Sequence, residues 1–187
     1  MIVTDTDATE RCFFTGLHDS LPEKLKNKIL IKVIKEETTK MIQACERLMS
    51  YDEQNRSSWI VFDRDQVPMF DEIIEKAESK NIEVGWSNPC FELWMYAYFG
   101  EMPVIHDSKK CCSEFGRLFK QKTGSEYKKS NEQIYSRLIK YGDEKHAIEI
   151  AKQKYEQCIR NGKIKPSQMI PCTTVHLLVD EIKGKTK

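Results

Sequence analysis

The chain has 187 residues, of which 40% are hydrophobic and 32% charged, and its net charge is +1. This composition is typical of a soluble folded protein rather than a disordered one, and the length favours one domain, since domains commonly span about 100–200 residues. No apolar run approaches the roughly 20 residues of a membrane span, and the N-terminus does not resemble a signal peptide, so we expect a cytoplasmic protein without membrane contact.

The two halves of the chain differ in charge. Residues 1–102 carry 12 Lys and Arg against 19 Asp and Glu, whereas residues 103–187 carry 18 against 10. An acidic half beside a basic half suggests a cation site next to a surface for a polyanion. A solvated basic helical face would give the same asymmetry.

Strands and helices are expected to alternate in the acidic half. Short apolar, β-branched runs predict strands, and apolar residues at helical spacing predict helices. The expected strands are Ile2–Val3, Ile29–Ile34, Ser57–Phe62 and Asn81–Trp86. The expected helices are Thr9–Leu21, 38–49, Phe70–Lys80 and Phe91–Phe99. This alternation predicts an α/β fold with a mostly parallel four-stranded sheet between flanking helices.

The basic half is expected to be helical. The predicted helices are Ser108–Gln121, Ser130–Lys140, Asp143–Arg160 and Thr173–Ile182, with no convincing strand among them. We therefore expect an α/β core over residues 1–102 and a helical extension over residues 103–187 packed on it, together forming a single domain.

The clearest chemical motif is Asp63-Arg64-Asp65, which directly follows a hydrophobic strand. In open parallel sheets ligands bind beyond the carboxyl ends of the strands. Side chains two residues apart in an extended chain point the same way, so Asp63 and Asp65 could share one hard cation such as Mg²⁺. An Asp-rich turn that caps the next helix is an equal alternative.

Two more carboxylates, Asp5 and Asp7, end the first predicted strand. If the first and third strands are neighbours, their carboxyl ends meet, and Asp5 or Asp7 joins Asp63 and Asp65 in one acidic cluster. Like charges so close are costly unless a cation neutralises them. The alternative is a solvated Asp7 that caps the following helix.

The segment from Trp86 to Trp94 also follows a strand and precedes a helix. Asn88 could orient a substrate through its amide. Glu92 lies in the first turn of an apolar helix, where the helix dipole favours a carboxylate for structural reasons alone. Its apolar neighbours suggest partial burial, which is costly for an unpaired charge. A role in a functional site is therefore as good an explanation of Glu92 as a structural role at the start of the helix.

Basic and sulfur-containing residues give weaker signals. Lys128 and Lys129 follow Tyr127 and could contact a phosphate backbone, although surface lysines are common. The seven cysteines form no CxxC pair, which argues against a zinc site or a disulfide framework and favours free thiols in a reducing cytoplasm. Cys90 has no histidine nearby in the sequence and is not expected to be a nucleophile.

Taken together, five segments resemble the RloB-like proteins, whose fold is related to Toprim. The segments are Ile2-Val3 with Thr9-Glu10-Arg11-Cys12-Phe13-Phe14, Val61-Phe62-Asp63-Arg64-Asp65, Ser87-Asn88-Pro89-Cys90-Phe91-Glu92-Leu93-Trp94, Tyr127-Lys128-Lys129, and Pro171-Cys172-Thr173-Thr174-Val175-His176-Leu177-Leu178-Val179. The resemblance spans nearly the whole chain, and the Ser-Asn-Pro-x-Phe-Glu-Leu-Trp string is its most specific part.

The resemblance implies phosphoryl chemistry on nucleic acid with Mg²⁺ or Mn²⁺. Asp63 and Asp65 match the DxD of Toprim domains and, with Asp5, would hold the metal. Asn88 and Glu92 would position substrate or water, and Lys128 or Lys129 would offset charge on the phosphate. RloB-like genes often lie beside an ATP-binding protein in bacterial defence loci, so such a partner is implied as well.

Two other functions remain open. The family usually has Glu-Gly where this chain has Asp5-Thr6, so a catalytically degenerate module that binds nucleic acid or an ATPase is one alternative. Val61 to Val67 also resembles the motif of haloacid-dehalogenase-type phosphatases, in which Asp63 would be the nucleophile and Asp65 the acid/base.

Overall fold

A five-stranded sheet organises the molecule, with strand order β2-β1-β3-β4-β5. The computed structural model describes residues 1–4, 8–33, 38–51, 57–65 and 67–184. The strands are β1 (Ile2–Thr4), β2 (Ile31–Val33), β3 (Trp59–Asp63), β4 (Glu83–Asn88) and β5 (Cys172–Thr173). The first four pair in parallel, and only β5 is antiparallel, to β4. The predicted α/β class with four parallel strands is therefore confirmed.

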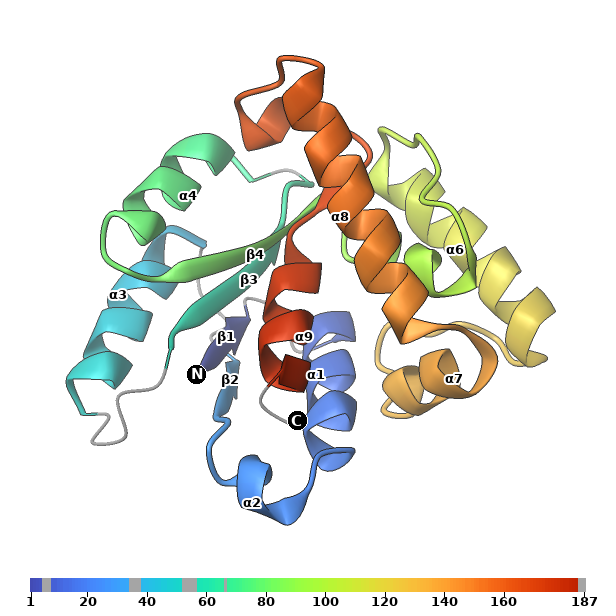
Figure 1. Cartoon of the computed structure of the whole chain (residues 1–187), viewed down its shortest axis with the longest axis horizontal. Helices are drawn as coiled ribbons and strands as arrows, with labels where there is room; N and C mark the ends of the chain where they lie inside the picture. Colours follow the sequence, from blue (N-terminus) through green and yellow to red (C-terminus); the bar gives the residue numbers. More distant parts are fainter. Residues whose placement is uncertain (5–7, 34–37, 52–56, 66, 185–187) are drawn as a thin grey trace.

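Helices cover both faces of this sheet (Figure 1). They are α1 (Thr9–Asp19), α2 (Glu23–Lys26), α3 (Thr38–Ser50), α4 (Phe70–Glu78), α5 (Glu92–Tyr96), α6 (Ser108–Thr123), α7 (Ile134–Tyr141), α8 (Glu144–Arg160) and α9 (Val175–Gly184). The single-turn helices η1 (Ala97–Phe99) and η2 (Pro166–Gln168) complete the set within the described part of the chain. In Figure 1, α3 and α4 lie on one side of the sheet and α1 and α9 on the other.

Strand β3 shows why the sheet is buried on both sides. Trp59 and Val61 belong to one hydrophobic cluster, and Ile60 and Phe62 belong to a second. Neighbouring side chains in a strand point to opposite faces, so this apolar run supplies two cores at once. The first cluster lies toward α1, α5 and α9, and the second lies toward α3 and α4.

The two halves of the chain share a core. Phe13 and Phe14 of α1 belong to the same cluster as Phe115 of α6, Tyr135 of α7 and Val179 of α9. The Phe13 and Tyr135 rings meet edge to face, with their centroids 5.3 Å apart. Residues from 103–187 therefore help to build the centre of the molecule as well as its outer side.

Several features differ from the sequence-based expectation, among them α2, which the sequence does not predict. The basic half contains a strand, β5, and Thr173 ends that strand instead of beginning a helix, so α9 starts at Val175. The expected helix Phe91–Phe99 divides into α5 and η1. Strand β5 has only two residues, which is too short for any alternation of polar and apolar side chains to reveal it.

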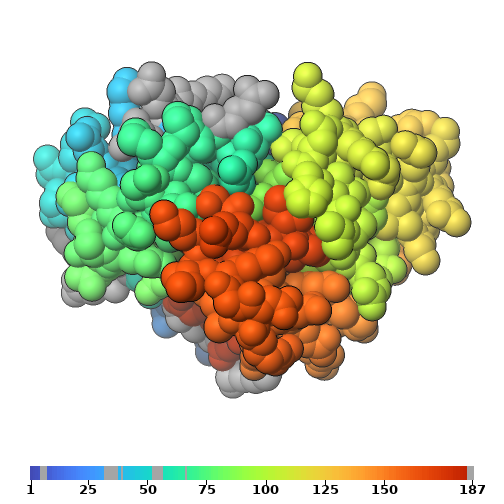
Figure 2. Space-filling model, turned by 90° about the horizontal axis from the view of Figure 1, so that it is seen from above, coloured from blue at the N-terminus to red at the C-terminus, as the bar shows by residue number. Residues whose placement is uncertain are grey.

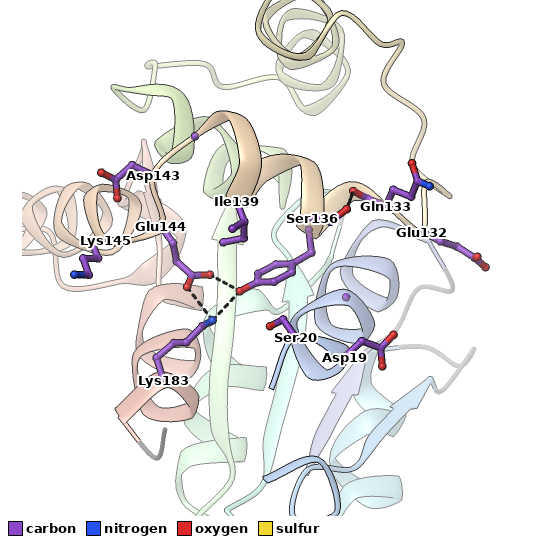
Figure 3. A pocket seen from close by; sticks show the side chains of 13 residues that line it. Asp19, Ser20, Glu132, Gln133, Ser136, Ile139, Asp143, Glu144, Lys145 and Lys183 are labelled. Atoms are coloured by element: carbon purple, nitrogen blue, oxygen red, sulfur yellow. Dashed lines mark hydrogen bonds and ion pairs between the residues drawn. The ribbon is translucent and has the colours of Figure 1, made fainter. Parts of the chain in front are cut away.

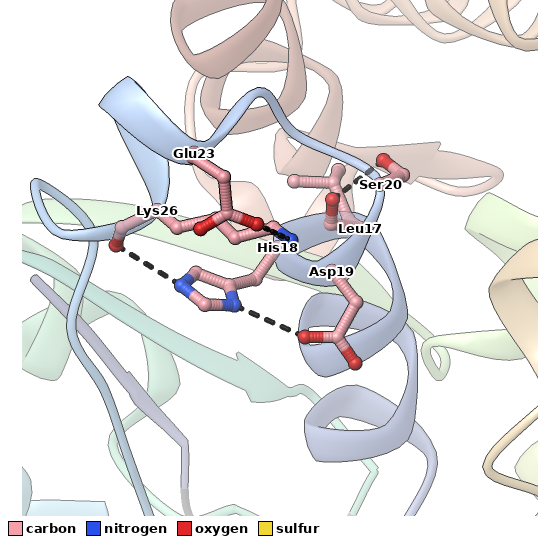
Figure 4. Close-up of polar contacts among 6 residues, drawn as sticks. All are labelled: Leu17, His18, Asp19, Ser20, Glu23 and Lys26. Atoms are coloured by element: carbon pink, nitrogen blue, oxygen red, sulfur yellow. Dashed lines mark hydrogen bonds and ion pairs between the residues drawn. The ribbon is translucent and has the colours of Figure 1, made fainter.

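A compact polar turn connects α1 to α2 (Figure 4). The His18 ring lies between the Lys26 carbonyl oxygen, 3.0 Å from Nε2, and the Asp19 carboxylate, 3.3 Å from Nδ1. Ser20 donates to the Leu17 carbonyl through both its Oγ and its backbone N–H, so this acceptor at the end of α1 is satisfied. His18 thus holds a structural position in this turn.

Among the helices that the structure describes, none combines the length and the apolar character needed to cross a membrane.

Candidate functional site

The carboxyl ends of β1, β3 and β4 lie at one edge of the sheet. Strand β1 pairs in parallel with β3, where Thr4 lies beside Val61, and β3 pairs in parallel with β4, where Asp63 lies beside Ser87. The first and third strands are therefore neighbours, as the expected acidic cluster requires. Asp5 and Asp7, which follow Thr4 in the sequence, lie outside the described residues.

The loops after β3 and β4 are tied together by their backbones. The Arg64 N–H donates to the Ser87 carbonyl at 2.8 Å, and the Asp65 N–H donates to the Pro89 carbonyl at 3.0 Å. These bonds continue the strand pairing past the last residue of β3. They fix the DxD segment against the Ser-Asn-Pro turn, with Asp63 half-buried and Asp65 exposed.

Asp63 lies on the side of the sheet that carries Glu92. The alternation along β3 puts its side chain on the same face as Trp59 and Val61, toward α5. The pKa of the Cys90 thiol points to the same placement. It is raised mainly by a hydrogen bond with Cys111 and by burial, and further by the negative charges of Glu92 and Asp63. Asp63 and Glu92 thus lie on the same side of the sheet, and the charges of both act on Cys90.

Glu92 is a buried carboxylate at the first position of α5, and only 1% of it is exposed. Tyr127 donates a 2.7 Å hydrogen bond to its Oε1. The Tyr127 hydroxyl in turn lies 3.2 Å from Thr9 Oγ1, which donates because the phenol proton is already used on Glu92. This chain of hydrogen bonds reduces the cost of holding a carboxylate away from water.

Lys129 adds a positive charge to the same place. Its Nζ lies 3.6 Å from Glu92 Oε1, and 59% of its side chain is exposed. Burial alone would lower the pKa of Lys129, but attraction to Glu92, and to a lesser extent to Asp63, raises it above its ordinary value. Lys129 therefore stays protonated beside two carboxylates, and its exposed side is open to a ligand. Lys128 is exposed to solvent.

Asn88 is not part of this group. Its Nδ2 donates to the carbonyls of Pro166 and Ser167, both at 3.2 Å, and Ser167 is bound through its N–H and hydroxyl to Asp71 of α4. Asn88 therefore faces the α4 side of the sheet, opposite to Asp63. Its buried Oδ1 has no hydrogen-bond partner among the described residues, so this atom is the one left for a ligand.

This edge of the molecule is seen from above in Figure 2. The orange segment that includes η2 lies between α4, in green, and the yellow-green chain that leads into α6. Segments distant in the sequence thus meet where β3 and β4 end.

The donor set at this edge suits a hard divalent cation. Asp63 and Asp65 offer carboxylate oxygens two residues apart, and the chemistry of such oxygens matches Mg²⁺, which binds through one or two carboxylates plus substrate phosphate and water. The half-buried setting of Asp63 beside Glu92 concentrates negative charge, which a cation would offset. The magnesium site on Asp5, Asp63 and Asp65 stays a prediction, since Asp5 lies outside the described residues.

Sequence reasoning missed the sulfur atoms beside Glu92. Cys90 Sγ lies 4.0 Å from Cys112 Sγ, and these two atoms and a Glu92 oxygen all lie within 4.8 Å of one another. Cys112 belongs to α6 and is 22 positions from Cys90, so the pair cannot be recognised from the spacing of the cysteines in the sequence. The packing of α5 against α6 creates it.

A pocket of about 810 Å³ lies elsewhere, between α1, α7, α8 and α9 (Figure 3). At its wall Glu144 Oε2 accepts hydrogen bonds from Tyr135 at 2.9 Å and Tyr98 at 3.0 Å, and Lys183 Nζ lies 3.1 Å from Glu144 Oε1. Every member of this network has a partner, so its role is to dock α9 against α7 and α8. None of the predicted site residues lines the pocket.

Comparison with known proteins gave one match. A family model described as RloB-like protein matches residues 1–182. No curated protein and no solved structure matched the chain.

Proposed function

Because the chain belongs to the RloB-like family, we propose that it is a metal-dependent nuclease that hydrolyses phosphodiester bonds of nucleic acid. The proposed active site lies at the carboxyl edge of β3 and β4, in a fold that we relate to Toprim. The observation that supports the proposal is the ion pair of Glu92 with Lys129 at 3.6 Å, on the face of the sheet toward which the alternation along β3 directs Asp63.

The acidic residues are assigned to the metal. We propose that Asp63 and Asp65 hold Mg²⁺ or Mn²⁺ together with Asp5, which directly follows the last residue of β1. When bound, such an ion polarises the scissile phosphate and lowers the pKa of a coordinated water. The half-buried Asp63 would fix the ion, and the exposed Asp65 would reach it from the substrate side.

The remaining residues are assigned to the substrate. Glu92, held by Tyr127, would position the ammonium of Lys129 toward the substrate through their ion pair. The exposed side of Lys129 and the neighbouring Lys128 would offset negative charge on the phosphate in the transition state. Asn88 would contribute its unpaired Oδ1 from the opposite side of the edge. The basic character of residues 103–187 is consistent with a nucleic-acid ligand.

We further propose that the protein acts in the bacterial cytoplasm, in defence against phage and together with an ATP-binding partner encoded nearby. This part of the proposal rests on membership of the family. In such a system the partner would control when the nuclease meets its substrate.

The test is cleavage of single- and double-stranded RNA and DNA by the full chain, with Mg²⁺, Mn²⁺ or EDTA, alone and with the neighbouring ATPase. We expect cleavage that needs the metal and that Asp63→Asn abolishes. Asp19→Asn, an exposed aspartate of α1, is the matched control and should cleave like the parent. Undiminished cleavage by Asp63→Asn would remove the assignment.

A second candidate is a non-catalytic module that binds nucleic acid or the ATPase. One observation favours it: the carboxylate of Glu92 already has two partners, Tyr127 and Lys129, as a purely structural carboxylate would. For this function we expect Mg²⁺ to raise the melting temperature of the parent but not of Asp63→Asn, with no turnover of any nucleic acid in the presence of the ATPase.

A further inference from the structure

The sulfur and carboxylate atoms beside the proposed active site form a second set of potential ligands. Cys90 precedes α5, Glu92 begins it, and Cys112 lies in α6. One ligand atom from each lies within 4.8 Å of the other two. Cys90 and Glu92 are buried and Cys112 is half-buried. We propose that these three residues bind a thiophilic divalent cation such as Zn²⁺, at a site distinct from the Mg²⁺ site on Asp63 and Asp65.

The spacing of the two sulfurs supports the proposal. A tetrahedral Zn²⁺ with Zn–S bonds of about 2.3 Å holds its two sulfur ligands roughly 3.8 Å apart. The sulfurs of Cys90 and Cys112 are 4.0 Å apart in the absence of any ion. The pair therefore needs little movement to close on a metal. With Glu92 as the third ligand, a fourth position stays open for water, as in sites of three protein ligands.

Glu92 has an oxygen available for this role. Within the described residues, the contacts from Tyr127 and Lys129 both use Oε1. The hydrogen bond from Tyr127 fixes the orientation of the carboxylate, which is the usual task of a residue behind a metal ligand. The carboxylate can therefore coordinate through Oε2 and keep its hydrogen bond.

The charges also balance. Each thiol loses its proton to solvent as its S–metal bond forms, so two thiolates and one carboxylate surround one dication. The single excess negative charge is offset by the ammonium of Lys129, which already lies 3.6 Å from Glu92.

Cobalt absorption tests the site directly. Co²⁺ is added to the reduced full chain under anaerobic conditions, and the sulfur-to-cobalt charge-transfer band and the visible bands of tetrahedral Co²⁺ are recorded. We expect both at one Co²⁺ per chain, with their loss on addition of Zn²⁺. We expect the charge-transfer band to fall by about half or more in Cys90→Ser and in Cys112→Ser. This readout is independent of any nuclease activity.

The chain offers a matched control in Cys158, a buried cysteine that lies beside another thiol, Cys172. Cys158→Ser should keep the full spectrum. Circular dichroism of each variant shows whether it is folded. A parent protein without a sulfur-to-cobalt band, or a band lost in Cys158→Ser and kept in folded Cys90→Ser and Cys112→Ser, overturns the proposal.

Discussion

The phenol of Tyr127 donates a 2.7 Å hydrogen bond to the carboxylate of Glu92, two residues that are 35 positions apart in the sequence. The bond joins the helical half of the chain to the α/β half at the edge where β3 and β4 end. It also explains how a carboxylate with only 1% exposure is tolerated there. The negative charge of Glu92, which belongs to the α/β half, is therefore stabilised by a hydrogen bond from the helical half.

Removal of this phenol should destabilise the fold. Tyr127→Phe keeps the ring contacts with Phe115 and Phe119 but leaves Glu92 without its closest donor. An unsatisfied buried acceptor costs about 1–3 kcal/mol, so we expect a loss of that size in the free energy of unfolding by urea. Tyr141→Phe, on an exposed ring, should change it little. Equal effects of the two variants would contradict a special role for Tyr127.

The polar network around Glu144 leads to a second prediction. Lys183→Met removes the ammonium that lies 3.1 Å from Glu144 and 2.8 Å from the Tyr135 hydroxyl. Because Lys183 is partly exposed, we expect a loss of only about 1 kcal/mol, measured by thermal or urea unfolding. Lys145→Met, an exposed lysine beside Glu144, serves as the control and should be neutral. A neutral Lys183→Met would show that the tyrosines alone hold Glu144.

Two glycines in helices should respond in opposite ways to alanine. A Cβ at Gly16 would lie 2.7 Å from Tyr135 Cβ, at the contact of α1 with α7, so Gly16→Ala should cost about 1–3 kcal/mol through overpacking. A Cβ at Gly116 would have 3.8 Å to its nearest neighbour, so Gly116→Ala should stabilise α6 by about 0.5–1 kcal/mol. Melting temperatures of the two variants that shift in the same direction would refute this reading of the packing.

The stability of the protein should fall in mild acid partly because of His176. Burial lowers the pKa of this side chain, whose Nδ1 donates to the Thr173 carbonyl. As pH falls through the ordinary histidine value of about 6.5, the unfolded chain binds a proton that the folded chain does not, so stability is lost. His176→Asn keeps a donor near Thr173 but does not titrate. Between pH 7 and pH 5, roughly the range in which histidine titrates, the melting temperature of His176→Asn should therefore decline less than that of the parent. An equal decline would exclude His176 as a cause.

Most strands and helices of the fold could be predicted from the spacing of apolar residues along the sequence. Residues 59–62 are apolar on both faces and bounded by polar segments, so they could be recognised as part of an interior strand of a parallel sheet. The amphipathic helices were recognised in the same way. Strand β5 was missed because its two residues pair with β4 across more than 80 positions, a relation without any local signal.

The candidate site was partly accessible from the sequence. Asp63 and the segment before Glu92 both follow parallel strands, and neighbouring parallel strands end at the same edge, so their approach could be foreseen. The partners of Glu92 could not, because Tyr127 and Cys112 reach it through the packing of α6 and the following loop. The position of Asn88 on the opposite face depends on the pleat at the last residue of β4, which no motif reveals.

The antiparallel pairing of β5 with β4 has a consequence for biosynthesis. The edge of β4 and the surface under α9 stay uncovered until Cys172 to Gly184 have left the ribosome. The indole N–H of Trp59 in β3 donates a 3.0 Å hydrogen bond to the carboxylate of Glu181 in α9, and this bond also forms only after α9 has been translated. The sheet and its α9 side are therefore completed only after residues 172–184 have been translated, so the α/β half of a nascent chain depends on a segment that is made later.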